Sequence, residues 1–302
     1  MLKSLLACLL LAGLTACATT GSDRSTPILV GGATGTQGGA VVQELLSRGY
    51  RVRALTRRPD SPAASRLAAL GVEVVQGDYN DAYSLDRALV GVRQMFFYSG
   101  RSAGELEEGL NVVAAAQRAG LDHLVYSSGA AAEPGKGLGG PKTQVELAII
   151  ASGVPYTVLR PVAFMENFDG QQQRIARRGI TDSRAPDRLL HFIAVQDIGL
   201  LVGAAFDNPQ RWIGQAINIA GDRLTVAEHV EVFSRVMQQP ITYHRLSPEA
   251  LQASLPKPLR PLFAWYETVG YTADVPALRA EFPQMLTLEQ YLRATGWEPG
   301  EE

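Results

Sequence analysis

The sequence predicts an α/β protein built on a doubly wound parallel sheet, followed by a smaller C-terminal α+β lobe. Three observations predict this class. Short apolar segments alternate with segments of helical periodicity from residue 27 to residue 129. A glycine-rich turn joins the first apolar segment to the first helical one. The 302 residues, 46% hydrophobic and 19% charged, can form a large core without disulfides or a structural metal.

The charge balance and the cysteine count exclude several function classes. Lys and Arg number 28 against 30 Asp and Glu, so no basic field exists for binding nucleic acid. The two cysteines are Cys8 and Cys17, so the chain after Cys17 has no thiol for catalysis, zinc binding or an internal disulfide. The four histidines are scattered without metal-ligand spacing and are expected to be ordinary surface or strand residues, so no metal site is expected.

The first 16 residues have the layout of a secretory signal. Lys3 precedes an apolar run that begins at Leu5, and small residues lead to Cys17. Twelve helical residues span about 18 Å, which is too short to cross a membrane. Residues 14–17, Leu-Thr-Ala-Cys, resemble a bacterial lipobox, which implies cleavage before Cys17 and lipid attachment to it. The alternative is an ordinary signal peptide that happens to contain a cysteine.

The residues around Cys17 also bear on location. Residues 17–26 combine the lipidated Cys17 with a small, polar tether. Ala18, rather than Asp, follows Cys17, which favours the periplasmic side of the outer membrane. No twin arginine precedes the apolar run, so the chain is expected to be exported unfolded and anchored to the membrane through its lipid.

The first βα unit has the pattern of a nucleotide-binding turn. A strand at 27–30 precedes Gly32, Gly35 and Gly38, and a helix is expected over 40–49. Glycine permits the tight turn, lets a pyrophosphate approach the main chain and allows close packing of helix and strand. The helix N-terminus then directs its N–H groups at the phosphates. The alternative is a glycine-rich turn without a ligand.

Two arginines follow the second strand, predicted over 51–56. Arg57 lies 19 residues after Gly38, where the fingerprint for NAD has an acidic residue that binds the ribose 2′-hydroxyl. No Asp or Glu occurs from residue 51 to 59. Guanidinium groups of Arg57 and Arg58 would bind a 2′-phosphate, so the pattern favours NADP(H) over NAD(H). The alternative is a pair of solvated arginines.

The alternation continues to the fifth strand. Helices are expected over 61–70, 81–90 and 105–119, and strands over 72–76, 94–98 and 123–126. In the helix over 105–119, Leu106, Leu110, Val113 and Ala114 share one side. Ligands bind beyond the carboxyl ends of such strands, so the polar and glycine residues that follow each strand are expected to line one cleft.

The C-terminal half predicts a second, partly interwoven lobe over 164–302, after a nucleotide-binding domain over 27–163. Residues 169–190 are weakly patterned and suggest a mobile segment over the cleft. Strands are expected at 191–195 and 216–220, and a helix over 199–206. Thr225 and Glu228 predict a capping box at the start of a helix that ends near residue 237.

These residues resemble the NmrA-like, or isoflavone-reductase-like, branch of the atypical short-chain dehydrogenases/reductases. The resemblance rests on GATGTQGG (32–39), ALTRRPDS (54–61), VEVVQGDYND (72–81), GLDHLVYSSG (120–129), PKTQVE (141–146), GVPYTVLRPVAFMENF (153–168), VQDIG (195–199) and AGDRLTVAE (220–228). These stretches run in consistent order through nearly the whole chain after residue 26.

The resemblance implies a Rossmann domain with NADP(H) in the groove beside the smaller lobe. It implies that the turn contacts the pyrophosphate, Arg57 and Arg58 the 2′-phosphate, and Lys142 the nicotinamide ribose. The segment from Pro161 to Phe164 would border the nicotinamide. The cofactor-binding residues implied are Gly32, Thr34, Gly35, Thr36, Gln37, Gly38, Arg57, Arg58, Asp78 and Tyr79 beside the adenine, Tyr98 and Ser99 along the ribose, Lys142 and Pro161.

The catalytic group is less clearly marked. No Tyr-x-x-x-Lys motif occurs, and Lys142 instead begins Lys-x-x-x-Glu with Glu146. In reductases of this branch the matching lysine acts as acid or base, whereas in sensor members it only holds cofactor, so Lys142 is the candidate catalytic residue. The alternative for Lys142 and Glu146 is a surface ion pair. The loop at 133–141 departs from the polar, histidine-containing loop usual in the family.

Two functions are compatible with these residues. One is an NADPH-dependent oxidoreductase acting on a small carbonyl, quinone or enone. The other is a non-catalytic NADP(H)-binding sensor or regulatory protein, favoured by the missing motif and by export to a compartment poor in NADPH. Another nucleotide or a periplasmic metabolite is a further alternative occupant of the groove, and the sequence does not identify a substrate or a protein partner.

Overall fold

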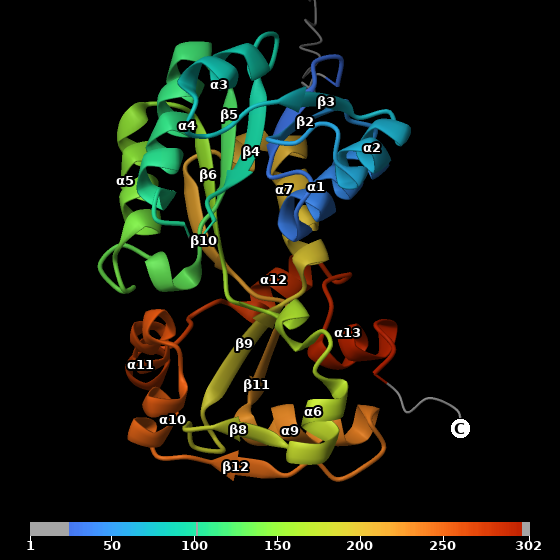
Figure 1. Ribbon diagram of the computed structural model, residues 1–302, viewed down its shortest axis with the longest axis vertical. Coiled ribbons are helices and arrows are strands. Elements are labelled where there is room, and N and C mark those ends of the chain that lie inside the picture. Colours follow the sequence, from blue (N-terminus) through green and yellow to red (C-terminus); the bar gives the residue numbers. More distant parts are fainter. Residues whose placement is uncertain (1–23, 101, 298–302) are drawn as a thin grey trace, which may run out of the picture.

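The computed structural model describes residues 24–100 and 102–297, so the predicted signal peptide and Cys17 lie outside the described residues. Seven parallel strands form the main sheet in the order β10-β6-β5-β4-β1-β2-β3 (Figure 1). This confirms the predicted doubly wound parallel sheet. Its strands are β1 (Ile28–Gly31), β2 (Val52–Thr56), β3 (Glu73–Gln76), β4 (Gln94–Tyr98), β5 (His123–Ser127), β6 (Tyr156–Pro161) and β10 (Gln215–Ile219).

Helices cover both faces of this sheet because the strands carry apolar residues on both faces. In β1, Ile28 and Val30 join one buried cluster and Leu29 joins the other. The first cluster includes residues of α1 (Thr36–Ser47), α2 (Pro62–Ala69), α7 (Val195–Asp207) and α8 (Pro209–Trp212). The second includes residues of α3 (Ala82–Ala88), α4 (Glu105–Ala119) and α5 (Pro141–Ser152).

Helix α4 has the predicted bounds, and Leu106 and Val113 of the predicted face pack in the core, but Leu110 does not. Leu110 is 40% exposed, whereas Val112, Ala115 and Ala116 are fully buried. A Cβ added at Gly109 would lie 2.3 Å from a methyl group of Val145 on α5. Small residues therefore form the interface and let the two helices approach closely, so the larger Leu110 faces outward.

The C-terminal lobe is built on two small sheets (Figure 1). The first, in the order β11-β9-β7, contains β7 (Ala163–Phe164), β9 (Leu189–Ile193) and β11 (Asp222–Thr225), and the second pairs β8 (Ile180–Asp182) with β12 (Tyr243–Arg245). The predicted capping box of Thr225 and Glu228 is present. The helices of this lobe are α6 (Gln172–Arg178), α9 (Val226–Val236), α10 (Pro248–Ser254), α11 (Arg260–Thr268), α12 (Val275–Glu281) and α13 (Leu288–Ala294), with short 3-10 turns at Met165–Phe168 and Lys257–Leu259. A further 3-10 turn, Ala130–Ala132, follows β5 of the main sheet.

Residues 169–190 are more ordered than their weak pattern suggests. They contain α6, β8 and the start of β9, and Ile175 is fully buried. Single apolar residues such as Ile175 and Ile180 pack in the core of the lobe and account for this regular structure, and the mobility of the segment stays a prediction. Helix α7 also begins at Val195, four residues before the predicted 199.

A half-buried carboxylate, Glu166, and a buried one, Asp197, connect the lobes at the start of α7. Glu166 Oε1 accepts a hydrogen bond of 2.8 Å from the backbone N–H of Val195, and Asp197 Oδ2 accepts one of 3.0 Å from Leu286 N–H. Burial raises the pKa of Asp197 to about 7.

In the part of the chain that the structure describes, no helix is long and apolar enough to cross a membrane.

Candidate functional site

The glycine turn between β1 and α1 leaves the helix N-terminus open to a ligand. Gly32 has φ +66°, a conformation that favours glycine. A Cβ at Gly38 would lie 2.2 Å from the Gly32 carbonyl oxygen, so only glycine allows this close packing. The N-cap, Gly35, supplies no side-chain acceptor, and the first turn of α1 has no acidic residue. The N–H groups of Thr36, Gln37 and Gly38 at this terminus therefore lack a side-chain cap.

Tyr98, at the end of β4, lies against this turn. Its hydroxyl oxygen would be 2.6 Å from a Cβ at Gly35, and its ring would be 2.6 Å from a Cβ at Gly32. Burial raises the pKa of the Tyr98 hydroxyl. The Tyr98 side chain thus covers the glycine turn. It lies nearer to the expected position of the pyrophosphate than the expectation of a place along the ribose implies.

Arg57 and Arg58 follow β2 and are exposed. Within the described residues, neither guanidinium has a carboxylate within ion-pair distance. Two guanidinium groups at the carboxyl end of the second strand suit a phosphate on the adenosine ribose. Thr34 is exposed in the turn, and Asp78, after β3, accepts a hydrogen bond of 3.0 Å from Asn80 N–H.

The side chain of Tyr79 is turned inward. Its hydroxyl oxygen would lie 1.9 Å from a Cβ at Gly31, and its ring meets Phe97 edge-on with centroids 6.3 Å apart. Burial raises the pKa of this hydroxyl, which has no hydrogen-bond partner among the described residues. The Tyr79 ring therefore lies beneath β1 beside Gly31 and Phe97, and the expectation that Asp78 and Tyr79 flank the adenine stays a prediction.

Lys142, near the start of α5, belongs to a polar network rather than to a pair with Glu146. Its Nζ lies 2.8 Å from Glu105 Oε1 and donates to the backbone oxygen of Ser99 at 2.7 Å and to Ser99 Oγ at 3.1 Å. The Ser99 hydroxyl also lies 2.9 Å from the hydroxyl of Tyr126. The ammonium is thus placed at the ends of β4 and β5, at the edge where the turn lies.

Glu146 is fully buried and pairs with Arg160 instead, so the surface ion pair between Lys142 and Glu146 is contradicted. Arg160 Nη2 lies 2.7 Å from Glu146 Oε2, and Arg160 Nε donates to the same oxygen at 2.9 Å. Glu133 lies 3.9 Å from Arg160 and accepts a hydrogen bond of 2.9 Å from Asn218 Nδ2. The pair joins α5 to β6. Glu146 lies one turn after Lys142, on the inner face of α5 that packs against the sheet.

Two further contacts position the cleft. Ser127, at the end of β5, donates a hydrogen bond of 2.8 Å to Gln37 Oε1 and so fixes the first turn of α1. Pro161 is buried at the end of β6, and Phe164 pairs in register with Ile193 of β9. The segment that would border the nicotinamide therefore connects the main sheet to the C-terminal lobe.

The predicted site residues lie along one edge of the sheet. The turn, Arg57, Asp78, Tyr98, Ser99 and Pro161 all follow the carboxyl ends of parallel strands, as the topology requires. Sequence reasoning missed Glu105 and Arg160. Glu105 is the first residue of α4 and is separated from Lys142 by a whole βα unit, so no local spacing marks it. Arg160 lies in the stretch 153–168 that carries the family resemblance, so the sequence marks its position. Nothing in the sequence indicates which residue it pairs with.

Three of the four histidines lie in strands, as expected for surface or strand residues, whereas His229 is buried on helix α9 and departs from that expectation. His123 is fully buried, His191 and His229 are 5% exposed, and only His244 is exposed. Burial lowers the pKa of His123 and of His191 to about 4 and that of His229 to about 3. In residues 24–100 and 102–297 no group of three His, Cys, Asp or Glu side chains could hold a metal ion.

Comparison with known proteins places this geometry in a family. The model of the NmrA-like family matches residues 24–292. The chain belongs to the NmrA-like family. A reductase from Streptomyces griseus subsp. griseus, whose substrate is a (4-alkanoyl-5-oxo-2,5-dihydrofuran-3-yl)methyl phosphate, is 33% identical over 244 residues, which cover 78% of this chain and 84% of the reductase.

Solved structures in the family share the fold. The NADPH complex of a quinone oxidoreductase from Escherichia coli superposes with a TM-score of 0.78 and 25% identity, covering 89% of this chain and 99% of that one. A negative transcriptional regulator, NmrA, in complex with NADP has a TM-score of 0.75 at 21% identity and covers 91% of this chain and 99% of its own. At that identity the likeness to the regulator shows the fold alone.

Proposed function

We propose that this NmrA-like protein is an NADPH-dependent oxidoreductase that reduces a small carbonyl, quinone or enone. The observation that carries the proposal is the uncapped glycine turn with two arginines beyond the next strand. The N–H groups at the start of α1 have no side-chain acceptor, and Arg57 and Arg58 have no carboxylate partner in the described chain. This arrangement offers hydrogen-bond donors to a diphosphate at the turn and to a 2′-phosphate beyond the next strand.

When bound, the dihydronicotinamide supplies a hydride. The chain's own groups would bind and orient the reactants. The amides at the start of α1 hold the diphosphate, and the Pro161 to Phe164 segment borders the reacting ring. Lys142, fixed by Glu105 and Ser99, places an ammonium at the same edge, where it holds a ribose hydroxyl or supplies a proton to the reduced product. Named relatives that act on a quinone and on an unsaturated lactone support an electron-poor acceptor.

Fluorescence titration of the purified protein with NADPH, followed by a panel of quinones, enones and carbonyls, tests the proposal. We expect binding of NADPH at micromolar concentration and its oxidation by at least one acceptor. No binding at millimolar NADPH would contradict the cofactor assignment. Lys142→Met separates the roles of Lys142: a fall in kcat at unchanged NADPH affinity indicates proton supply, whereas weaker NADPH binding alone indicates cofactor holding.

A sensor function is the second candidate, and the Tyr126 hydroxyl favours it. A catalytic tyrosine would have to reach the substrate. The tyrosine beside Lys142 and Ser99 is Tyr126, which is fully buried and hydrogen-bonded to Ser99, so it does not reach one. Tight NADPH binding without turnover across the acceptor panel would favour the sensor over the reductase.

We also propose that the chain is exported and anchored to the cell envelope through lipid on Cys17, on the periplasmic side of the outer membrane. Only the sequence of residues 1–26 supports this. Cys17→Ser should release the protein from membranes and abolish labelling by radioactive palmitate, whereas Cys8→Ser should leave both unchanged. Membrane association of Cys17→Ser that survives carbonate washing would contradict the anchor.

A further inference from the structure

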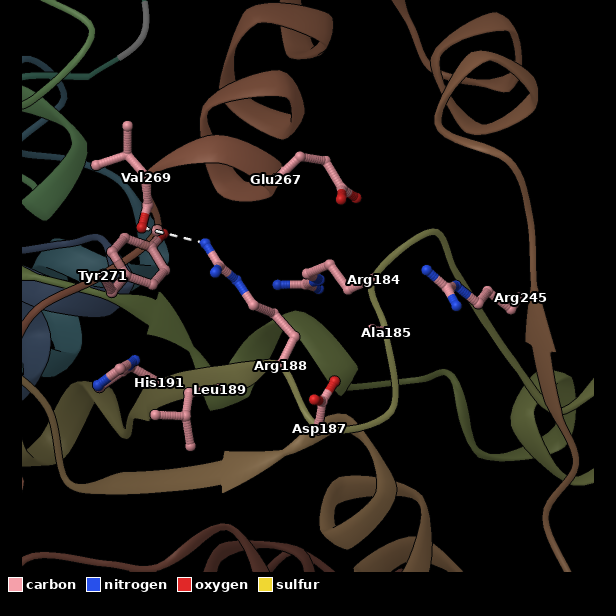
Figure 2. Close-up of a pocket in the computed structure, with 11 residues that line it drawn as sticks. Arg184, Ala185, Asp187, Arg188, Leu189, His191, Arg245, Glu267, Val269 and Tyr271 are labelled. Carbon is pink, nitrogen blue, oxygen red and sulfur yellow. Dashed lines mark hydrogen bonds between the residues drawn. The ribbon is translucent and has the colours of Figure 1, made fainter.

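A pocket of about 560 Å³ lies in the C-terminal lobe, between the β8–β9 connection and α11 (Figure 2). A volume of this size suits a small organic molecule. The walls come from Arg184 and Arg188 in the connection, His191 on β9, Arg245 at the end of β12, and Tyr271 after α11. None of these residues belongs to the glycine turn or to the Lys142 network.

The pocket continues the face of β9 that begins beside the proposed nicotinamide border. Phe164 pairs with Ile193, and both pack in the core cluster of the main sheet. Leu190 and Phe192 point to the opposite cluster, so His191 shares the face of Ile193 and lines the pocket. At about 3.3 Å per strand residue, His191 lies about 7 Å beyond Ile193. The pocket and the proposed nicotinamide border thus lie along the same face of β9.

Three arginines line this pocket, and Figure 2 shows the guanidinium group of Arg184 between those of Arg188 and Arg245. Arg188 donates only to the backbone oxygen of Val269, at 3.3 Å, and Arg245 only to that of Ser183, at 3.1 Å. No carboxylate of the described residues lies within ion-pair distance of either group. Arg184 differs, because its Nε donates to both carboxylate oxygens of Asp182 at 3.0 Å.

The acidic groups at the pocket form no ion pair with Arg188 or Arg245 among the described residues. Glu267 and Asp187 also line the pocket, but the Glu267 carboxylate accepts the hydrogen bond of the Ser183 hydroxyl. His191 also lines the pocket. It is 5% exposed, and its buried Nδ1 has no hydrogen-bond partner among the described residues. Two guanidinium groups without a carboxylate partner among the described residues thus line a single hollow.

We propose that this pocket binds an anionic substituent of the substrate, a sulfonate, carboxylate or phosphate, through Arg188 and Arg245. Guanidinium groups bind such oxyanions through paired, charge-assisted hydrogen bonds. The inference rests on the proposed reductase function and adds a substrate class to it: acceptors whose reducible group and negative charge are separated by about one aromatic ring.

Calorimetric titration with 2-naphthalenesulfonate and its neutral analogue 2-naphthol tests the pocket without turnover. We expect the sulfonate to bind at least tenfold more tightly than the naphthol. Arg188→Ala combined with Arg245→Ala should remove this preference. Arg235→Ala is the matched control, because Arg235 is an exposed arginine of the same lobe that pairs with Glu289. Equal affinities in the unaltered protein, or an unchanged preference in the double variant, would overturn the inference.

A kinetic experiment tests whether the bound anion is part of the substrate. The ratio of kcat/KM for 1,4-naphthoquinone-6-sulfonate to that for 6-methyl-1,4-naphthoquinone should fall at least tenfold in the double variant and stay constant in Arg235→Ala. Sulfonate binding with an unchanged ratio would contradict the substrate assignment. If neither quinone is reduced, the proposed reductase function fails for quinones, while calorimetry still decides the anion site on its own.

Discussion

The substitution Gly38→Ala tests whether the close approach of α1 to the turn supports cofactor binding. The added Cβ would lie 2.2 Å from the carbonyl oxygen of Gly32, 2.5 Å from its carbonyl carbon and 2.8 Å from the nitrogen of Ala33. All three atoms are backbone, so no side chain can rotate away. Because non-bonded contacts are comfortable at about 3.5 Å, the helix must move back by about 1 Å.

That displacement sets the expected magnitudes. Overpacking of this kind costs about 1–3 kcal/mol of unfolding free energy. A hydrogen bond of about 2.9 Å lengthened by 1 Å is lost, so the diphosphate should bind at least about tenfold more weakly. Urea unfolding measures the first effect, and fluorescence titration with NADPH measures the second.

Gly39→Ala provides the control from the next position of the same helix. Its Cβ would meet only the carbonyl oxygen of Ala33, at 3.7 Å, which is an ordinary contact. Alanine in a helix should then raise stability by about 0.4–1 kcal/mol and leave NADPH affinity unchanged. Equal NADPH affinities of Gly38→Ala and Gly39→Ala would refute the link between this close packing and cofactor binding.

Three further predictions concern charge. Arg57→Glu should raise the dissociation constant of NADPH about 10- to 100-fold, since a charged hydrogen bond contributes about 1.5–3 kcal/mol, with little change for NADH; equal losses in parallel titrations would contradict the 2′-phosphate assignment. Glu146→Gln should leave Arg160 without its buried partner and cost about 3 kcal/mol, roughly 10 °C in calorimetric Tm; a shift below about 2 °C argues against the pair. Burial in an aromatic cluster, with a smaller effect from Arg184, lowers the pKa of His229 to about 3, so its neutral form stabilises the fold fully above about pH 6.5 and less as the pH falls towards 3. His229→Phe should therefore reduce the acid loss of stability by up to about 1.4 kcal/mol per pH unit in urea titrations; parallel curves for the two proteins would contradict this sign.

The main sheet could be predicted from sequence because each strand and helix is marked locally. Apolar runs such as 94–98 and the capping box at Thr225 depend on neighbours in the chain, and both are confirmed. The turn was found for the same reason, since Gly32 and Gly38 act within one βα unit. The signals that failed depend on packing: Leu110 is exposed because Gly109 brings α4 against Val145.

The polar network around Lys142 could not be predicted because its partners come from distant elements. The spacing to Glu146 suggests a pair, yet Glu146 faces inward to Arg160 and Lys142 reaches Glu105 on another helix. Which of two nearby charges a lysine meets is decided by helix rotation in the tertiary structure. The inward turn of the Tyr79 ring has a similar cause, because the space beside Gly31 exists only once β1 and β4 are paired.

A crystal structure of the protein with NADPH is the measurement that addresses the central claim most directly. We expect the diphosphate within hydrogen-bond distance of the amides of residues 36–38, the 2′-phosphate against Arg57 or Arg58, and the Tyr98 ring displaced from Gly35. A structure in which saturating NADPH leaves Tyr98 across the turn, with the coenzyme absent or bound elsewhere, would contradict it.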